Sequence, residues 1–239
     1  MRNVATVAAL GREVSTLIAS SKRVEREYQG RKFVFFEQDE RVIVCAGIGA
    51  EPARRAAEAV IALYHPALLQ SVGFAGALQP SLRVGDIMVP AAVVDARDGS
   101  RVEIADGNGV LLTFMAVAGM QQKANLAQAY GAQAVDMEAA AVASAARAHD
   151  IMFRAIKVIS DESDFEIPEM ARFIDAHGRF RTASFAIFVA LRPWLWLRVA
   201  LLASNSGKAA RVLSDYLERS HHPLSDAVEA RTTEISSNH

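Results

Sequence analysis

The stretch AVDMEAAAVASAARAHDIMFRAIKVI, residues 134–159, is the part of the sequence that most clearly predicts a fold. The alanines of its first half favour a helix over residues 136–149, because alanine has the highest helix propensity. Residues 153–159 form a short run that is rich in β-branched and aromatic side chains, which indicates a strand. A helix of this length that leads to a strand is typical of the crossover connections in a parallel sheet.

Strands and helices alternate in the same way along the rest of the chain. Further strands are predicted at residues 4–9, 32–37, 41–46, 68–74, 85–94 and 110–117, of which 32–37 and 41–46 form a hairpin-like pair. Further helices are predicted at residues 12–20, 52–64 and 121–130. This order predicts an α/β fold, a three-layer α/β/α sandwich with a mixed, mainly parallel central sheet.

Composition limits the class of protein. The chain has 239 residues, 51% of them apolar, and a formal net charge of −1. A chain of this length can bury a sizeable core in one unit, and its near-neutral charge gives no general attraction to nucleic acid, so no nucleic-acid partner is expected. The single cysteine, Cys45, lies in an apolar run and the N-terminus shows no export signal, so we expect a cytoplasmic protein.

Glycines and carboxylates follow four of the predicted strands. They lie in AGIGAEP (46–52), SVGFAGALQPSLRVGD (71–86), AVDME (134–138) and VISDESD (158–164). Ligands of open α/β sheets bind beyond the carboxyl ends of the strands, so these segments form the candidate site. The six histidines are scattered and none is paired with a carboxylate at the spacing of metal ligands, so no metal site is predicted.

These four segments, in this order, resemble the nucleoside phosphorylase and nucleosidase superfamily, and in particular the branch of methylthioadenosine/S-adenosylhomocysteine nucleosidases. The resemblance covers about residues 4–190. It implies an enzyme with a three-layer α/β fold that cleaves the bond between a purine and C1′ of a ribose. It also implies that the enzyme needs no metal or organic cofactor and forms a homodimer.

The resemblance implies roles for the segment VDME. Glu138 would hold the ribose hydroxyls, Met137 would pack against the sugar, and Asp136 would be a second acid in the substrate site. Cleavage passes through a cationic ribosyl group, so a carboxylate on the 2′-hydroxyl becomes more favourable as the reaction proceeds. The alternative is structural, since acids at the start of a helix commonly cap it and complement its dipole.

The segment VISDESD carries the expected general acid. By resemblance, Asp161 protonates N7 of adenine so that the base leaves neutral, and Ser160 orients the base. The alternative is that these two residues form an N-cap or an Asx turn. The glycine-containing segment is expected to contact the substrate through Gly73, Phe74, Ala75 and Gly76.

The segment AALGREV resembles the nucleosidase pattern in which a glutamate positions the attacking water, which gives this role to Glu13. The arginine-bearing loops that bind phosphate in phosphorylases are not evident, so hydrolysis is favoured over phosphorolysis. The alternative for Glu13 is an ordinary solvent-facing residue near the start of a helix.

Three departures from the nucleosidase pattern concern the base and the glycine-containing segment. Phe74 stands where a small hydroxylated residue is usual, and Ala77 replaces a glycine. The segment that supplies a purine-stacking phenylalanine is not recognisable, and stacking is assigned instead to Phe114 or Met115.

Residues 173–220 resemble the hopanoid-associated phosphorylase group, which removes adenine from adenosylhopane. We expect a catalytic domain over 1–190, an apolar helical extension over 191–220 and a flexible tail over 221–239. Within 184–203, tryptophans and arginines interrupt an apolar run as in an interfacial helix, which predicts peripheral contact with the inner membrane face and a lipid-linked substrate. The alternative is a buried final helix with a subunit contact.

The predicted function is cleavage of the N-glycosidic bond of a 5′-modified adenosine, with adenosylhopane as the specific substrate. One alternative is a nucleosidase for soluble methylthioadenosine, S-adenosylhomocysteine or futalosine. Another is a non-catalytic nucleoside-binding protein on the same fold. Glu13, Glu138 and Asp161 argue against the binding protein, because a binder needs no general acid.

Overall fold

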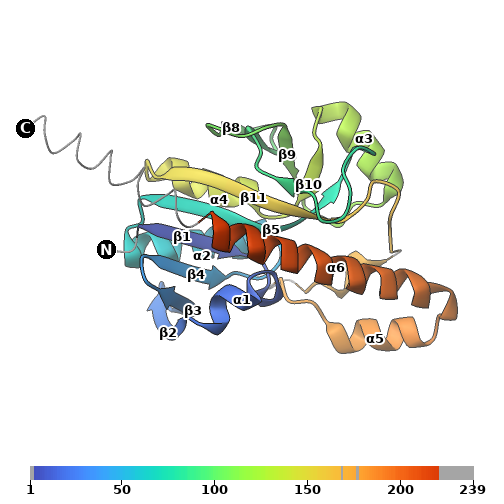
Figure 1. The fold of residues 1–239 in the computed structure, drawn as a ribbon, viewed down its shortest axis with the longest axis horizontal. Helices are drawn as coiled ribbons and strands as arrows, with labels where there is room; N and C mark the ends of the chain where they lie inside the picture. The colour runs from blue at the N-terminus through green and yellow to red at the C-terminus, as the bar shows by residue number, and fades with distance from the viewer. Residues whose placement is uncertain (1–2, 168, 176–177, 221–239) are drawn as a thin grey trace, which may run out of the picture.

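The computed structural model describes residues 3–167, 169–175 and 178–220, and the predicted tail at 221–239 lies outside them. Within these residues, eleven strands form one mixed sheet with the order β2-β3-β4-β1-β5-β10-β9-β7-β8, and β11 pairs with β5 and β6 (Figure 1). The strands are β1 (Val4–Ala8), β2 (Lys22–Tyr28), β3 (Arg31–Gln38), β4 (Arg41–Cys45), β5 (Leu68–Ala77), β6 (Ile87–Met88), β7 (Ala92–Asp95), β8 (Arg101–Glu103), β9 (Val110–Thr113), β10 (Ala134–Asp136) and β11 (Met152–Asp161).

The centre of the sheet is parallel and its margins are antiparallel. β1 pairs in parallel with β4 and β5, β5 with β11, and β9 with β7 and β10. Antiparallel pairs join β2 to β3, β3 to β4, β7 to β8, β6 to β11 and β10 to β5. The mixed sheet that the sequence predicts is confirmed.

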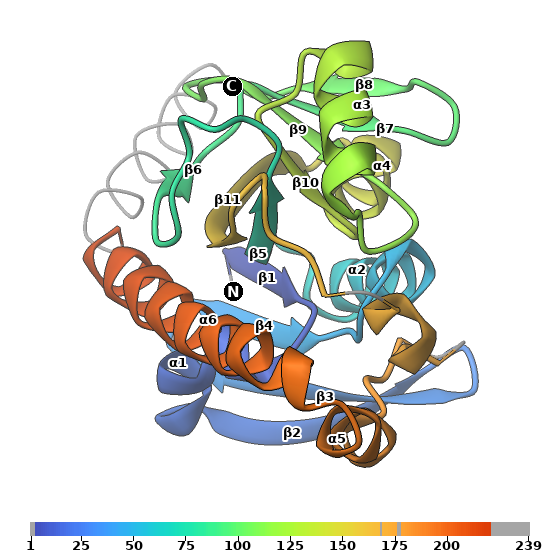
Figure 2. The same cartoon turned by 90° about the vertical axis from the view of Figure 1, so that its right-hand side faces the viewer.

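Helices cover both faces of the sheet, which gives the three layers. They are α1 (Ser15–Ala19), α2 (Ala50–Tyr64), α3 (Met120–Tyr130), α4 (Ala139–Ala148), α5 (Thr182–Ala190) and α6 (Pro193–Arg219), with 3₁₀ turns at Gly11–Glu13 and Met170–Phe173. Along β4, Val42 and Val44 pack with α2 and α4, whereas Ile43 packs with α1 and α6. Figure 2 shows these helix pairs on opposite sides of the strands. The alternation follows from the two-residue period of a strand.

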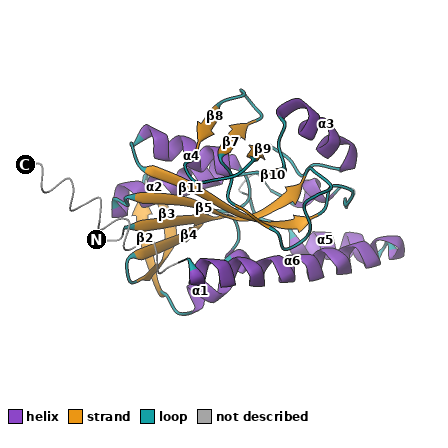
Figure 3. Ribbon diagram, turned by 45° about the horizontal axis from the view of Figure 1, so that its top comes forward, coloured by secondary structure: helices purple, strands orange, loops and turns teal. Residues whose placement is uncertain are grey.

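Helix α6 belongs to both the core and the site. Its C-terminal half buries Ala209, Leu213 and Leu217 against Ile156 and Val158 of β11. Its N-terminal half lies beside α5, beyond the ends of the strands (Figures 1 and 3). At 1.5 Å per residue this helix is about 40 Å long, which is enough to reach from one region to the other. No helix in the described part of the chain combines the length and the apolar character needed to span a bilayer.

Four details differ from the elements that the sequence predicts. β2 was not predicted, because most of its side chains are exposed and its sequence KRVEREY is largely polar. The strand expected at 85–94 is two strands, β6 and β7, that pair with different partners on either side of Pro90. The helix expected at 12–20 is a 3₁₀ turn followed by α1, and the helix expected from residue 136 begins at Ala139, because residues 134–136 form β10.

Candidate functional site

A cavity of 720 Å³ opens at the carboxyl ends of the central strands. All four segments that the sequence singled out reach it: Gly47 and Ile48 follow β4, Phe74–Gly76 lie at the end of β5, Val135 and Asp136 end β10 with Met137 and Glu138 directly after it, and Ser160 and Asp161 end β11. The loop of residues 9–13 after β1 completes this side of the wall. The volume is in the range of pockets that bind small molecules.

Glu13 points into the protein, which excludes the solvent-facing alternative. Its side chain is buried, and its Oε2 accepts a hydrogen bond from the Leu10 N–H at 3.0 Å. Burial raises the pKa of the Glu13 carboxyl, although hydrogen bonding by Leu10 and the positive charge of Lys157 oppose the shift. A carboxylate with a raised pKa is better suited to accept a proton near neutral pH.

Gly73 makes room for Glu13. A Cβ atom added to Gly73 would lie 3.0 Å from Glu13 Oε2, and the backbone φ of Gly73 is +152°, where side chains are rarely tolerated. Gly73 itself is not among the residues that line the cavity. Gly73 therefore leaves space for the carboxylate of Glu13, and its expected contact with the substrate stays a prediction.

Glu138 also lies buried on the cavity wall. Its Oε1 accepts a hydrogen bond from the Gly49 N–H at 2.7 Å, directly before the start of α2, and its Oε2 accepts one from the Met137 N–H at 3.3 Å. The N-terminus of a helix favours negative charge. Burial, with the neighbouring charge of Asp136, nevertheless raises the pKa of Glu138 to about 7.

Asp136, rather than Glu138, caps helix α4. One oxygen of Asp136 accepts the Ala139 N–H at 2.9 Å and the other accepts the Thr113 hydroxyl at 2.6 Å. The buried ammonium of Lys157 lies 2.9 Å from the same carboxylate, whose side chain is 0% exposed. The structural alternative that the sequence left open thus applies to Asp136.

Asp161 ends β11 with its carboxylate toward the cavity. Its Oδ1 accepts a hydrogen bond from the Ser160 hydroxyl at 2.7 Å, and its Oδ2 accepts one from the Lys123 ammonium at 2.5 Å. The side chain of Asp161 is 23% exposed, whereas that of Lys123 is 2% exposed. A cap or turn is not the main role of this carboxylate, because its partners are the two side chains.

The residues that follow β9 correct the prediction about base stacking. Neither Phe114 nor Met115 is among the residues that line the cavity. Phe114 packs in the apolar cluster around Leu112, and Met115 is 73% exposed. After β9, the residues that line the cavity are Ala116, Val117 and Ala118. This part of the wall therefore presents small side chains and no aromatic ring.

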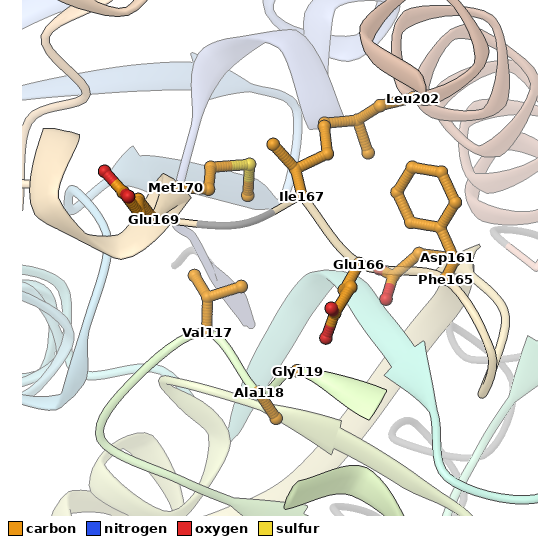
Figure 4. A pocket seen from close by; sticks show the side chains of 10 residues that line it. All are labelled: Val117, Ala118, Gly119, Asp161, Phe165, Glu166, Ile167, Glu169, Met170 and Leu202. Atoms are coloured by element: carbon orange, nitrogen blue, oxygen red, sulfur yellow. The ribbon is translucent and has the colours of Figure 1, made fainter. Parts of the chain in front are cut away.

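A smaller cavity of 210 Å³ adjoins the first at Asp161. Figure 4 shows Ile167, Met170 and Leu202 along one side of it and Val117 and Ala118 along the other. Asp161 and four of these five residues also line the larger cavity, and Ile167 does not. The space beside Asp161 therefore has mainly apolar walls, which suits a flat heterocyclic base.

Helices α5 and α6 form the remaining wall of the larger cavity. Phe185 of α5 and Val199 and Leu202 of α6 face it, together with Phe180. The outer side of the same hairpin exposes large apolar side chains: Ile187, Leu191, Trp194, Trp196, Leu197 and Leu201. In the single chain, the apolar run at 184–203 thus exposes most of its large side chains, with Leu195 buried, and whether a subunit or a lipid covers them stays a prediction.

The sequence did not indicate three contacts that the structure places around the site. Lys123 contacts Asp161, Lys157 contacts Asp136, and Gly49 donates to Glu138. Lys123 lies in a helix among polar neighbours, where a lysine is normally expected to be exposed to solvent. Lys157 lies in an apolar run, FRAIKVI, and a charge in a predicted buried strand was the one available signal.

Known proteins share this architecture. The 5′-methylthioadenosine/S-adenosylhomocysteine nucleosidase of Helicobacter pylori has a TM-score of 0.68 and 16% identity, over 91% of this chain and 97% of that one. Futalosine hydrolase of Helicobacter pylori strain 26695 has a TM-score of 0.66 and 17% identity, over 91% and 96%. The 5′-methylthioadenosine/S-adenosylhomocysteine nucleosidase of Colwellia psychrerythraea 34H, in complex with adenine, has a TM-score of 0.60 and 23% identity, over 68% and 84%.

At these identities the likeness shows the fold alone. No match was found among curated proteins. A family profile described as the phosphorylase superfamily matches residues 3–116 and 108–191, which together make up most of the sequence. The chain therefore belongs to the phosphorylase superfamily.

Proposed function

We propose that this protein cleaves the N-glycosidic bond of a 5′-modified adenosine and releases adenine. One observation carries the proposal: Glu13, Glu138 and Asp161 come from three distant segments and line one cavity. Two of these carboxylates are buried, and because burying an acid costs free energy, such groups are typical of functional sites. Solved proteins of the same fold include nucleosidases, one of them in complex with adenine.

Asp161 is the general acid of this proposal. Asp161 takes up a proton from solvent and passes it to N7 of adenine while the C1′–N9 bond breaks, and the bonding electron pair leaves with the base. A purine anion would be a poor leaving group, so the positioned acid contributes a factor of about 10²–10⁴. The Ser160 hydroxyl holds Oδ1 of Asp161, so this serine orients the acid rather than the base.

Glu138 and Met137 bind the sugar. The Glu138 carboxylate accepts a hydrogen bond from the ribose 2′-hydroxyl, and this hydrogen bond strengthens as positive charge develops on the ribosyl group. Met137 lines the cavity beside it and packs against the ribose. Asp136 binds the start of α4 and the ammonium of Lys157, whereas Glu138 is held by the N–H groups of Gly49 and Met137.

Glu13 positions the nucleophilic water. The water adds to C1′ and gives a proton to the Glu13 carboxylate, so that the products are adenine and a 5′-modified ribose. The side chain lies close to the backbone of Gly73 and Phe74, on the β5 side of the cavity. A phosphate dianion beside the ionised form of this buried carboxylate would be repelled, which favours hydrolysis over phosphorolysis, although Arg12 and Arg179 also line the cavity.

The 5′ substituent is apolar in this proposal, and adenosylhopane is the substrate that we favour. The wall made by Phe180, Phe185, Val199 and Leu202 is apolar and belongs to the α5–α6 hairpin. The outer side of this hairpin carries Trp194 and Leu197 with Arg192 and Arg198 nearby, the composition of an interfacial helix. We propose that this face meets a lipid surface and that the cavity receives the substrate from it.

A soluble 5′-thioadenosine or futalosine nucleosidase is the second candidate. The structures of the two Helicobacter pylori proteins favour it, because they share the fold over nearly their whole length. The two candidates differ in the 5′ substituent alone. For this candidate, the outer apolar face of α5 and α6 would be covered by a second copy of the chain instead of lipid.

The test is an adenine-release assay with adenosines that carry methylthio, hexyl, dodecyl and hopanyl groups at C5′, with and without phosphate. We expect kcat/KM to rise with the length of an apolar substituent, by up to about 0.8 kcal/mol of binding free energy for each buried methylene. We also expect no dependence on phosphate. Equal turnover of all members would favour the soluble nucleosidase, and no adenine release from any member would refute the proposed reaction.

A further inference from the structure

Lys123 is a buried cation at the edge of the cavity that the reaction above does not use. It lies in the second turn of α3, and its side chain is 2% exposed. Its ammonium donates to Asp161 Oδ2 at 2.5 Å, to the Glu162 carbonyl at 2.7 Å and to the Phe165 carbonyl at 3.1 Å. The three donors of the lysine therefore all have partners.

The pair formed by Lys123 and Asp161 differs from the other buried lysine pair. Lys157 and Asp136 are both sealed from solvent, with exposed side-chain fractions of 2% and 0%. Asp161 is 23% exposed and lines the cavity, so one partner of the Lys123 pair is open to a ligand. Burying an ion pair seldom adds stability over apolar side chains of the same size, so the ion pair by itself is a weak reason for a lysine at this position.

Gly76 shows that the backbone accommodates this pair. A Cβ atom added to Gly76 would lie 2.9 Å from Asp161 Oδ2 and 3.4 Å from Lys123 Cε. The glycine at the end of β5 thus opens the space in which the carboxylate and the lysine meet. The nearby Ser160 hydroxyl holds the other carboxylate oxygen, so each oxygen of Asp161 has its own donor.

We propose that Lys123 is the positioning residue of Asp161, an inference that rests on the function proposed above. Lys123 and Ser160 together set the plane of the carboxyl group before the nucleoside binds. Lys123 also ties the backbone of residues 162–165 to α3, and Phe165 of this segment lines the smaller cavity. A misplacement of about 1 Å of a catalytic group can cost about 100-fold in rate.

The test compares Lys123→Met with Asp161→Asn and with the double variant. Methionine keeps the length and the apolar stem of lysine and removes the ammonium. We expect Lys123→Met to lower kcat about 100-fold while KM changes by less than about threefold. Because Lys123 acts through Asp161, the same substitution in the Asp161→Asn background should lower kcat by less than about threefold.

A matched control is Lys208→Met. Lys208 donates to the Val84 carbonyl at 2.7 Å and does not line the cavity, so its loss removes a lysine-to-backbone hydrogen bond away from Asp161. We expect unchanged kcat in this variant. Lys123→Gln, which retains a donor to the carbonyl groups, serves as the second variant if the methionine variant does not fold.

The outcomes separate this inference from the proposed function. Wild-type kcat in Lys123→Met, with a slow Asp161→Asn, would refute the role of Lys123 and leave the proposed reaction standing. Losses that multiply in the double variant would show that Lys123 supports the fold and not the acid. Wild-type kcat in Asp161→Asn would refute the general acid, and the positioning role with it.

Discussion

The raised pKa of Glu138 leads to a measurable pH dependence of stability. A Glu138 pKa of about 7 in the folded protein, against an ordinary value of 4.5, means that the folded state binds a proton more tightly than the unfolded state. This proton stabilises the fold fully below pH 4.5, and the stabilisation is lost as the pH rises through 7. A difference of 2.5 pH units corresponds to about 3 kcal/mol in the free energy of unfolding.

The perturbation is Glu138→Gln, which keeps the shape of the side chain and removes its titration. The free energy of unfolding from urea titrations should fall in the wild type by about 2 kcal/mol more than in the variant between pH 5.5 and pH 8.5. The exposed Glu218 provides the matched control, and Glu218→Gln should follow the wild type. Equal pH slopes for the wild type and Glu138→Gln would show that the Glu138 carboxyl is not held in a site that disfavours its charge.

The same carboxyl should control the reaction. Holding the ribose hydroxyl through the transition state requires the ionised form of Glu138, so kcat/KM should decline as the pH falls through about 7. In Glu138→Gln the rate should be low at every pH and this decline should be absent. An unchanged acidic limb in the variant would assign the titration to another group.

The remaining predictions concern the acid, the water, the backbone and the outer face. Asp161→Asn should keep substrate binding, measured by calorimetry, but lower kcat by about 10²–10⁴, and a variant with more than about a third of the wild-type rate would contradict the assignment. Glu13→Gln should lose most adenine release in water, whereas turnover that rises in proportion to added phosphate would show phosphorolysis. Gly73→Ala should displace the Glu13 carboxylate, since the new Cβ atom would lie 3.0 Å from its Oε2. The substitution should lower kcat strongly and the Tm only slightly. A variant with normal kcat would show that this close approach does not matter for the reaction. Replacing Trp194 and Trp196 with Ser should weaken sedimentation with anionic liposomes and leave turnover of a soluble analogue nearly unchanged; a wild-type protein that stays in the supernatant would refute the lipid contact.

Local patterns in the sequence were sufficient for the central elements. The alanines of 139–148 favour a helix and the β-branched residues of 153–159 favour a strand through their own local propensities. The structure has α4 and β11 at these positions. The motifs at the strand ends were also readable, because the carboxyl ends of parallel strands must lie at one edge of the sheet. The segments that carry Glu138 and Asp161 could therefore be brought to one edge from the sequence, whereas Glu13 and the roles of all three acids came from the resemblance to the nucleosidases.

Contacts between distant segments decided the rest. Whether Asp136 or Glu138 caps α4 depends on Gly49, which lies 89 positions from Glu138 and draws its carboxylate away from the helix start. The burial of Lys123 depends on the end of β11, 38 positions further along the chain. The exposure of Trp194 depends on where α6 extends beyond the sheet, which cannot be predicted from the spacing of apolar residues along the helix. The sequence by itself determined the elements and the chemical groups, because these follow from local propensity and residue type, whereas the partners and the burial of each group arise from packing that only the tertiary structure specifies.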